Sequence, residues 1–124
     1  MPNPPDIAPA EWKVMRLLWR HAPLPAADII QALAEREDWH PNTIKTLLAR
    51  LVRKRALGAR RHQGRFHYRP LVSEEDCLRV ESESFLERCF DGAVQPLLAH
   101  FARRQKLTLK DLDRLRRILE AEEP

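Results

Sequence analysis

The chain has 124 residues, of which 44% are hydrophobic and only three are glycine, and its formal net charge is +4. This length suits one domain with a short additional segment, and the apolar content argues against disorder. No stretch approaches the roughly 18 uncharged apolar residues of a membrane span, the N-terminus lacks a secretory signal pattern, and two cysteines are too few for a disulfide framework. We therefore expect a cytoplasmic protein with no membrane partner.

The positive charge is concentrated in the first part of the chain. Residues 1–72 carry 13 Lys and Arg against 6 Asp and Glu, whereas residues 73–124 carry 9 against 12. Between Lys45 and Arg69 there are nine basic residues and no acidic one. Such a run favours a polyanionic partner, although a run of charge is also typical of a solvated surface. Charge alone therefore leaves both interpretations open.

Two helices are expected at the start of the chain. The first has Pro9 in its opening turn, carries apolar residues at three- and four-residue spacing as far as Trp19, and stops at Ala22-Pro23. The second opens at Pro25, runs to about Arg36, and places its apolar residues on one stripe. Only a short turn separates these two helices.

A third helix is expected to begin at Pro41. Its apolar residues form one core-facing stripe, and the opposite side is polar. At about 100° per residue, that outer side centres on Asn42, Thr46, Ala49 and Arg53, with Lys45 and Arg50 beside it. A merely solvated helix would mix Glu with Lys and Arg, and this side has no acid. This pattern favours DNA binding over a merely solvated surface.

The hydrophobic period changes to two after this helix. Ala59 to His62, the turn Gln63-Gly64, and Arg65 to Arg69 predict a β-hairpin, with Phe66 and Tyr68 toward the core. Three helices followed by a two-stranded hairpin predict a winged helix-turn-helix domain, in which the third helix enters the major groove. We expect a mainly α protein with this domain at residues 1–72.

Residues 73–124 are expected to form a helical dimerisation region. Ser73 and its following acids start one helix that ends near Asp91-Gly92, Ala93 to Gln105 form another, and Thr108 with Asp111 caps a last one. About 50 residues are too few to bury three apolar stripes alone, so these must pack on the winged helix or on a second copy. A second copy is favoured. The apolar positions assigned to dimerisation are Leu78, Phe85, Leu86, Phe90, Leu97, Leu98, Phe101, Leu112, Leu115 and Leu119.

Three segments carry a family resemblance: the stretches 10–15 (AEWKVM), 38–51 (DWHPNTIKTLLARL) and 68–72 (YRPLV). They resemble the penicillinase-repressor (BlaI/MecI/CopY) family, over about residues 7–119. The resemblance implies a dimeric winged-helix repressor that binds inverted repeats in promoters of resistance or stress operons and is released by an inducing signal. By position it also implies reading-helix contacts from Asn42, Thr43, Lys45, Thr46 and Arg50, and a wing contact from Arg65.

Some positions depart from the family pattern. The beta-lactam branch implies a sensor protease and cleavage at an Asn-Phe bond, and the candidate cleavage position here is His100-Phe101. The copper-responsive branch carries Cys-x-Cys pairs near the C-terminus, which this tail lacks. Ala8 stands where many relatives have a Ser cap, which should cost the first helix about 1 kcal/mol.

The cysteines, tryptophans and histidines are interpreted without a functional role. Cys77 and Cys89 lie about 18 Å and about 120° apart on one expected helix, so they cannot meet within a chain. They are expected to be buried apolar residues, with a redox pair formed across a dimer as the alternative. Trp12, Trp19 and Trp39 are interpreted as core anchors, with base stacking as the alternative. The scattered histidines predict no metal site, and no phosphate loop or nucleophile arrangement predicts an enzyme or a cofactor.

The leading hypothesis is repression by occlusion, in which a dimer binds a palindromic operator in double-stranded DNA. Phosphate contacts are expected from Arg53, Lys54, Arg61 and Arg65. The alternative is a winged-helix protein-interaction module without specific DNA binding, whose basic face meets an acidic partner.

Overall fold

The computed structural model describes residues 4–122. Backbone contacts divide the chain into two units, Met1–Glu81 and Ser82–Pro124, and the boundary falls within one helix, α4 (Glu74–Phe90). Each unit is described by itself. No helix between residues 4 and 122 combines the length and the apolar character needed to cross a membrane.

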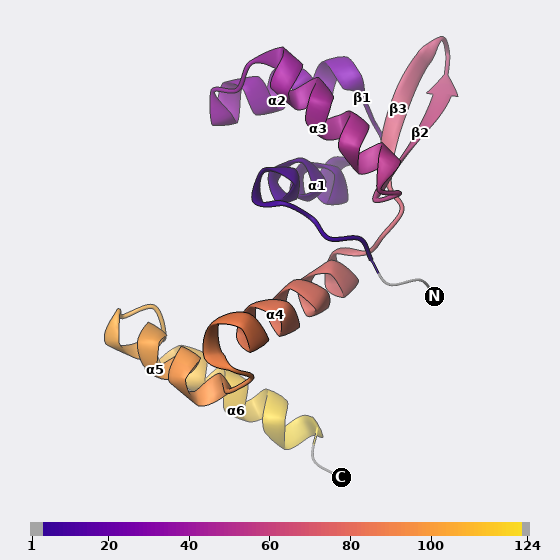
Figure 1. The fold of residues 1–124 in the computed structure, drawn as a ribbon. Coiled ribbons are helices and arrows are strands. Elements are labelled where there is room, and N and C mark those ends of the chain that lie inside the picture. The colour runs from indigo at the N-terminus through magenta and orange to yellow at the C-terminus, as the bar shows by residue number, and fades with distance from the viewer. Residues whose placement is uncertain (1–3, 123–124) are drawn as a thin grey trace. The chain divides into compact units, whose positions relative to one another are not determined.

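The first unit contains three helices and a hairpin. The helices are α1 (Pro9–His21), α2 (Ala26–Glu37) and α3 (Pro41–Arg53), and the hairpin strands are β2 (Leu57–His62) and β3 (Arg65–Pro70). The hairpin extends past the helices as a wing (Figure 1). This is the predicted winged-helix order.

Local signals explain where the helices begin. α3 has Pro41 in its first turn, and the Nδ1 atom of His40 accepts a hydrogen bond of 3.1 Å from the backbone N–H of Asn42. α1 also opens on a proline, and the Oε1 atom of Glu11 accepts a bond of 2.8 Å from the N–H of Ala8. Ala8 has no side-chain acceptor to return that bond, so α1 has half a capping box.

A short strand that the sequence did not reveal completes the sheet. β1 (Leu24–Pro25) follows a cis Ala22-Pro23 bond and pairs with β3, giving the antiparallel order β1-β3-β2. The register places Leu24 opposite Tyr68 and His62 opposite Arg65. Two residues are too few to show a strand period, so only pairing with β3 defines this strand.

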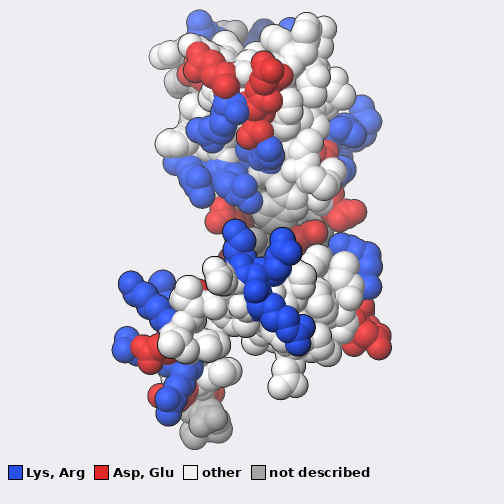
Figure 2. All heavy atoms as spheres, turned by 90° about the vertical axis from the view of Figure 1, so that its left-hand side faces the viewer, with Lys and Arg blue, Asp and Glu red and all other residues white. Residues whose placement is uncertain are grey.

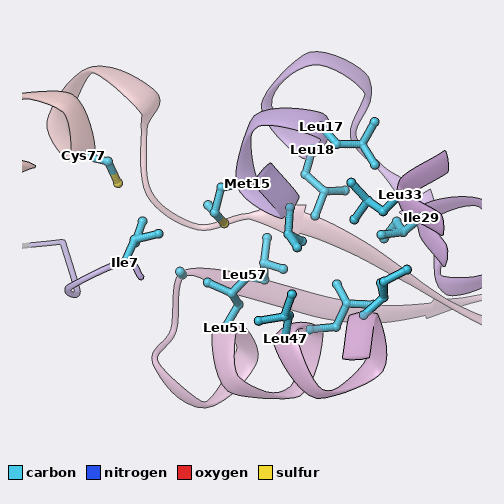
Figure 3. Close-up of a cluster of buried hydrophobic side chains, with 14 residues drawn as sticks. Ile7, Met15, Leu17, Leu18, Ile29, Leu33, Leu47, Leu51, Leu57 and Cys77 are labelled. Atoms are coloured by element: carbon cyan, nitrogen blue, oxygen red, sulfur yellow. The ribbon is translucent and has the colours of Figure 1, made fainter. Parts of the chain in front are cut away.

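The core of the first unit lies between the three helices and the base of the wing. Leu18 of α1, Leu33 of α2, Leu51 of α3 and Leu57 of β2 are all buried, and Figure 3 shows them converging. Burying one such side chain stabilises the fold by about 1.5–3 kcal/mol relative to leaving it exposed. Three partly buried tryptophans pack against this core: Trp12, Trp19 and Trp39. Their packing agrees with the interpretation of these residues as core anchors.

One prediction about the wing was wrong. Phe66 was expected to face the core, but it is 51% exposed. It shares a side of the hairpin with Tyr68, which does pack on the core, yet it lies nearer the tip, beyond the reach of the helices. The guanidinium of Arg61 lies 5.4 Å from the centre of its ring instead.

The second unit contains the end of α4, then α5 (Val94–Arg103) and α6 (Leu109–Glu122). The predicted caps are confirmed: the N–H of Asp76 donates to Ser73 Oγ at 3.1 Å, and Thr108 and Asp111 bond each other's backbone N–H. None of the residues described from 82 to 122 is buried. Cys77, in the first unit, is buried as expected, whereas the same expectation for Cys89 was wrong, because Cys89 is exposed.

Candidate nucleic-acid interface

The outer side of α3 is exposed and carries no acidic group. The predicted base-reading residues all lie exposed on this helix: Asn42, Thr43, Lys45, Thr46 and Arg50. Their helix is held from behind by four fully or almost fully buried apolar side chains, Ile44, Leu47, Leu48 and Leu51. Burial of one stripe therefore presents the opposite stripe to solvent.

One polar side chain on α3 is already oriented. The hydroxyl of Thr46 donates a hydrogen bond of 2.9 Å to the carbonyl of Asn42, one turn earlier. This bond uses the only proton of the hydroxyl and leaves its oxygen free to accept, so Thr46 would act on a base edge as an acceptor. Asn42 keeps a side-chain donor and acceptor, the pair that suits adenine.

The last turn of α3 is tied to α1. The ammonium of Lys54, directly after α3, lies 2.6 Å from Glu11 Oε1 and 2.9 Å from the carbonyl of Asp6. Arg50 Nε lies 3.9 Å from Glu11 Oε2. The structure thus places two predicted DNA-contacting side chains against one buried carboxylate, while Arg53 is exposed.

The two sides of the wing differ in chemistry. Arg61 and Phe66 share one side, and Arg65 at the tip lies on the other, because side chains alternate along paired strands. The side of Arg65 also carries Arg60 and Arg69. The predicted wing residues Arg61 and Arg65 therefore do not form one cluster.

A hollow of about 350 Å³ marks the Arg65 side of the wing; its lining residues are Pro23, Arg60, His62, His67 and Arg69. The rings of His62 and His67 meet edge to face with centroids 5.6 Å apart. Arg60 was not among the predicted DNA-contacting residues, although a signal existed: a two-residue turn fixes the hairpin register and so places Arg60 beside His67.

Charge is distributed differently elsewhere. On the face shown in Figure 2, Asp and Glu lie among Lys and Arg. Residues 39–73, which include α3 and the wing, contain no Asp or Glu at all. A polyanion would therefore meet attraction without local repulsion along α3 and the wing.

The second unit carries an apolar surface. A groove of about 430 Å³ between α5 and α6 is lined almost entirely by aliphatic side chains: Val94, Leu98, Leu112, Leu115, Ile118 and Leu119, with Arg116. Of the other residues predicted for dimerisation, Leu78, Phe85 and Phe101 are exposed, and Leu86, Phe90 and Leu97 are partly buried. We call the groove and its lining the α5–α6 surface.

The candidate cleavage position lies within α5. His100 and Phe101 are both exposed residues of this helix, with ring centroids 5.9 Å apart. The carbonyl of Phe101 accepts a bond of 2.8 Å from the N–H of Lys106, which closes the end of the helix.

Comparison with known proteins identifies the family. Residues 7–121 match the family model described as penicillinase repressor. The chain belongs to the penicillinase repressor family. This membership confirms the resemblance stated from the sequence, and since the family consists of repressors, it also confirms that the chain is not an enzyme.

Curated members of the penicillinase repressor family align over nearly the whole chain. The chain is 34% identical to the penicillinase repressor of Bacillus licheniformis over 116 residues, covering 94% of this chain and 91% of that one. It is 32% identical to the methicillin resistance regulatory protein MecI of Staphylococcus aureus, strain N315, covering 92% of this chain and 93% of that one.

Solved structures of the penicillinase repressor family agree with the fold. The DNA-binding domain of the repressor BlaI superposes with a TM-score of 0.55 at 36% identity, covering 61% of this chain and 93% of that one. The same values hold for monomeric Bacillus licheniformis BlaI in complex with the blaP half-operator. These structures confirm the predicted winged-helix fold class.

Proposed function

We propose that this chain is a DNA-binding transcriptional repressor that acts as a homodimer on an inverted-repeat operator. In this proposal residues 1–72 form the DNA-binding domain and residues 73–124 the dimerisation region. The observation that carries it is the exposed outer side of α3, which combines hydrogen-bonding and basic residues without one acid. Membership of a family whose named members are repressors supports the same conclusion.

Base reading is proposed for α3. Asn42, Thr43, Lys45, Thr46 and Arg50 occupy its exposed positions. An arginine can bond the O6 and N7 atoms of guanine, and an asparagine the N6 and N7 atoms of adenine, so Arg50 and Asn42 are the candidates for sequence discrimination.

Phosphate binding is proposed for Arg53, Arg61 and Arg65. These residues are exposed, and phosphate contacts position a protein on the duplex without selecting sequence. Arg60 and Arg69 extend the Arg65 side of the wing with the same charge. Lys54, which the sequence suggested for the same role, forms an ion pair with Glu11 instead.

Dimerisation is proposed for residues 73–124. A helical body without one buried residue among 82–122 has little core of its own, and a second copy of the α5–α6 surface is the partner that would cover it. The residues that carry this role are Leu78, Phe85, Leu86, Phe90, Leu97, Leu98, Phe101, Leu112, Leu115 and Leu119. A two-fold dimer holds its reading helices about one or more DNA turns apart, which requires a palindromic site.

The regulated genes are proposed to belong to a resistance or stress operon, as the names of the relatives suggest. The protein is proposed to act in the cytoplasm. Release by a sensor protease that cleaves at His100-Phe101 is the accompanying proposal for induction. The peptide bond between His100 and Phe101 lies within the helix α5. Because the bond is part of a helix, local unfolding of the end of α5 would have to precede cleavage.

The experiment compares binding of labelled duplexes from the chain's own upstream region and of unrelated sequence at several salt concentrations. Arg50→Ala should lose about 1–3 kcal/mol more on the upstream duplex than on unrelated duplex, whereas Arg61→Ala should weaken both alike. Lys110→Ala on α6 is the matched control and should change neither. A wild-type protein without preference for its upstream region would contradict the proposal and favour a protein-interaction module.

Sedimentation tests the assembly separately. Leu115→Glu places a charge in the α5–α6 surface and should convert a dimer into monomers, with half-operator binding retained. Arg117→Glu, on the same helix but outside the lining of the groove, should leave the dimer intact. A wild-type monomer at micromolar concentration would contradict the dimer.

A further inference from the structure

A buried carboxylate lies beneath the end of the reading helix. The side chain of Glu11, on α1, is 0% exposed. Its Oε1 atom accepts hydrogen bonds from the N–H of Ala8 at 2.8 Å and from Lys54 Nζ at 2.6 Å. Its Oε2 atom is buried without a hydrogen-bond partner and lies 3.9 Å from Arg50 Nε.

Capping of α1 does not account for this arrangement. The cap requires one acceptor atom for the N–H of Ala8, and a neutral glutamine would provide it. A buried oxygen without a hydrogen bond is costly, and native proteins contain few of them. What the negative charge adds is attraction for the two cations that α3 brings to it, Arg50 and Lys54.

The two cations are held differently. Lys54 forms a short ion pair and also bonds the carbonyl of Asp6, so two of the three ammonium donors are engaged, although its side chain is 34% exposed. The side chain of Arg50 is 49% exposed, and its contact with Glu11 runs through Nε, at the base of the guanidinium. The edge formed by the two terminal nitrogens, which can bond guanine in a bidentate manner, is not engaged by that contact.

We propose that Glu11 is a positioning residue that sets the DNA specificity of α3. It withholds Lys54 from DNA phosphate, which limits sequence-independent binding, and it orients Arg50 toward the base edges. The inference rests on the proposed function of α3.

The test is Glu11→Gln, which keeps the size of the side chain and an acceptor for Ala8 but removes the charge. Binding to upstream and unrelated duplex is measured from low to moderate salt. Each added phosphate contact steepens the slope of log K against log salt by about 0.9. We expect the slope to steepen by about 0.9 on both duplexes, which corresponds to one added phosphate contact. The preference for upstream duplex should fall about tenfold as Arg50 loses its orientation.

Lys54→Met provides the second variant. In the otherwise unchanged protein it should leave the salt slope as it is, because Lys54 does not contact phosphate. Combined with Glu11→Gln, it should return the steepened slope to the wild-type value. Arg53→Met, an exposed neighbour proposed to contact phosphate, is the matched control and should lower the slope by about 0.9.

The outcomes separate the two proposals. A wild-type protein with no preference for its upstream region contradicts the proposed function. If the wild-type protein prefers its upstream duplex, and Glu11→Gln leaves either the salt slope or the ratio of the two affinities unchanged, the proposed role of Glu11 is overturned. If Glu11→Gln does not fold by circular dichroism, Lys54→Met decides: a slope lowered by about 0.9 overturns the withheld lysine, and an unchanged slope supports it.

Discussion

The indole Nε1 of Trp19 donates a hydrogen bond of 2.9 Å to the carbonyl of Val72, 53 residues later in the chain. Trp19 lies on α1, and Val72 lies in the segment between β3 and α4. The ring also packs against Trp12, with centroids 5.7 Å apart. One side chain therefore joins the first helix to the exit of the wing, through both apolar contact and a directional bond.

Trp19→Phe should destabilise the first unit by about 1–3 kcal/mol. Phenylalanine keeps much of the apolar contact but leaves the partly buried carbonyl of Val72 without its donor. Urea unfolding followed by circular dichroism measures the change. Trp39→Phe, at a ring that lies 5.8 Å from Lys13 Nζ, is the comparison and should cost less; equal losses would argue against a role for the hydrogen bond.

Ala8→Ser should stabilise α1 by about 1 kcal/mol. Ala8 has the extended backbone of an N-cap, φ −70° and ψ 157°, and Glu11 already supplies one half of a capping box. A serine Oγ could accept the N–H of Glu11 and complete it. Thermal unfolding checks the gain. Ala10→Ser adds the same side chain inside the first turn, where no gain is expected, and an equal gain there would exclude capping as the cause.

Arg55→Gly should stabilise the end of α3 by about 1 kcal/mol. The N–H of Ala56 bonds the carbonyl of Leu51, and that of Arg55 bonds the carbonyl of Val52, which is a Schellman ending. It requires left-handed backbone at Arg55, φ 66°, where a Cβ atom is unfavourable. Ala49→Gly, inside the same helix, should instead cost about 1 kcal/mol in urea unfolding. A loss from both variants would contradict this assignment.

Cys77 should react slowly with a disulfide reagent in the folded protein. Burial, and secondarily the charge of Asp76, raise the pKa of its thiol, so less of the reactive thiolate is present near pH 8. In a Cys89→Ser background the remaining thiol should react many-fold faster in urea than in buffer, and its rate in buffer should still rise above pH 9. Equal rates with and without urea would show that Cys77 is accessible.

Many elements of this fold follow from local sequence. Ser73 and the Thr108 and Asp111 pair cap helices as predicted, because a cap involves residues only three apart. The core stripe of α3 follows in the same way from its spacing. Phe66 shows the limit of such patterns: alternation predicts its side of the strand, but the length of the helices decides whether anything covers it.

The amino-acid sequence alone determined the order of helices and hairpin, the acid-free side of α3 and the family resemblance, since each rests on residues close together in the chain. Packing decided which of the basic side chains lie against a buried carboxylate. Lys54 meets Glu11 across 43 residues because α1 packs on α3, and no periodicity encodes that contact. The strand β1 likewise exists only where Leu24 meets Tyr68. Long-range contacts of this kind depend on how the buried side chains fill one core, and that is a property of the folded chain.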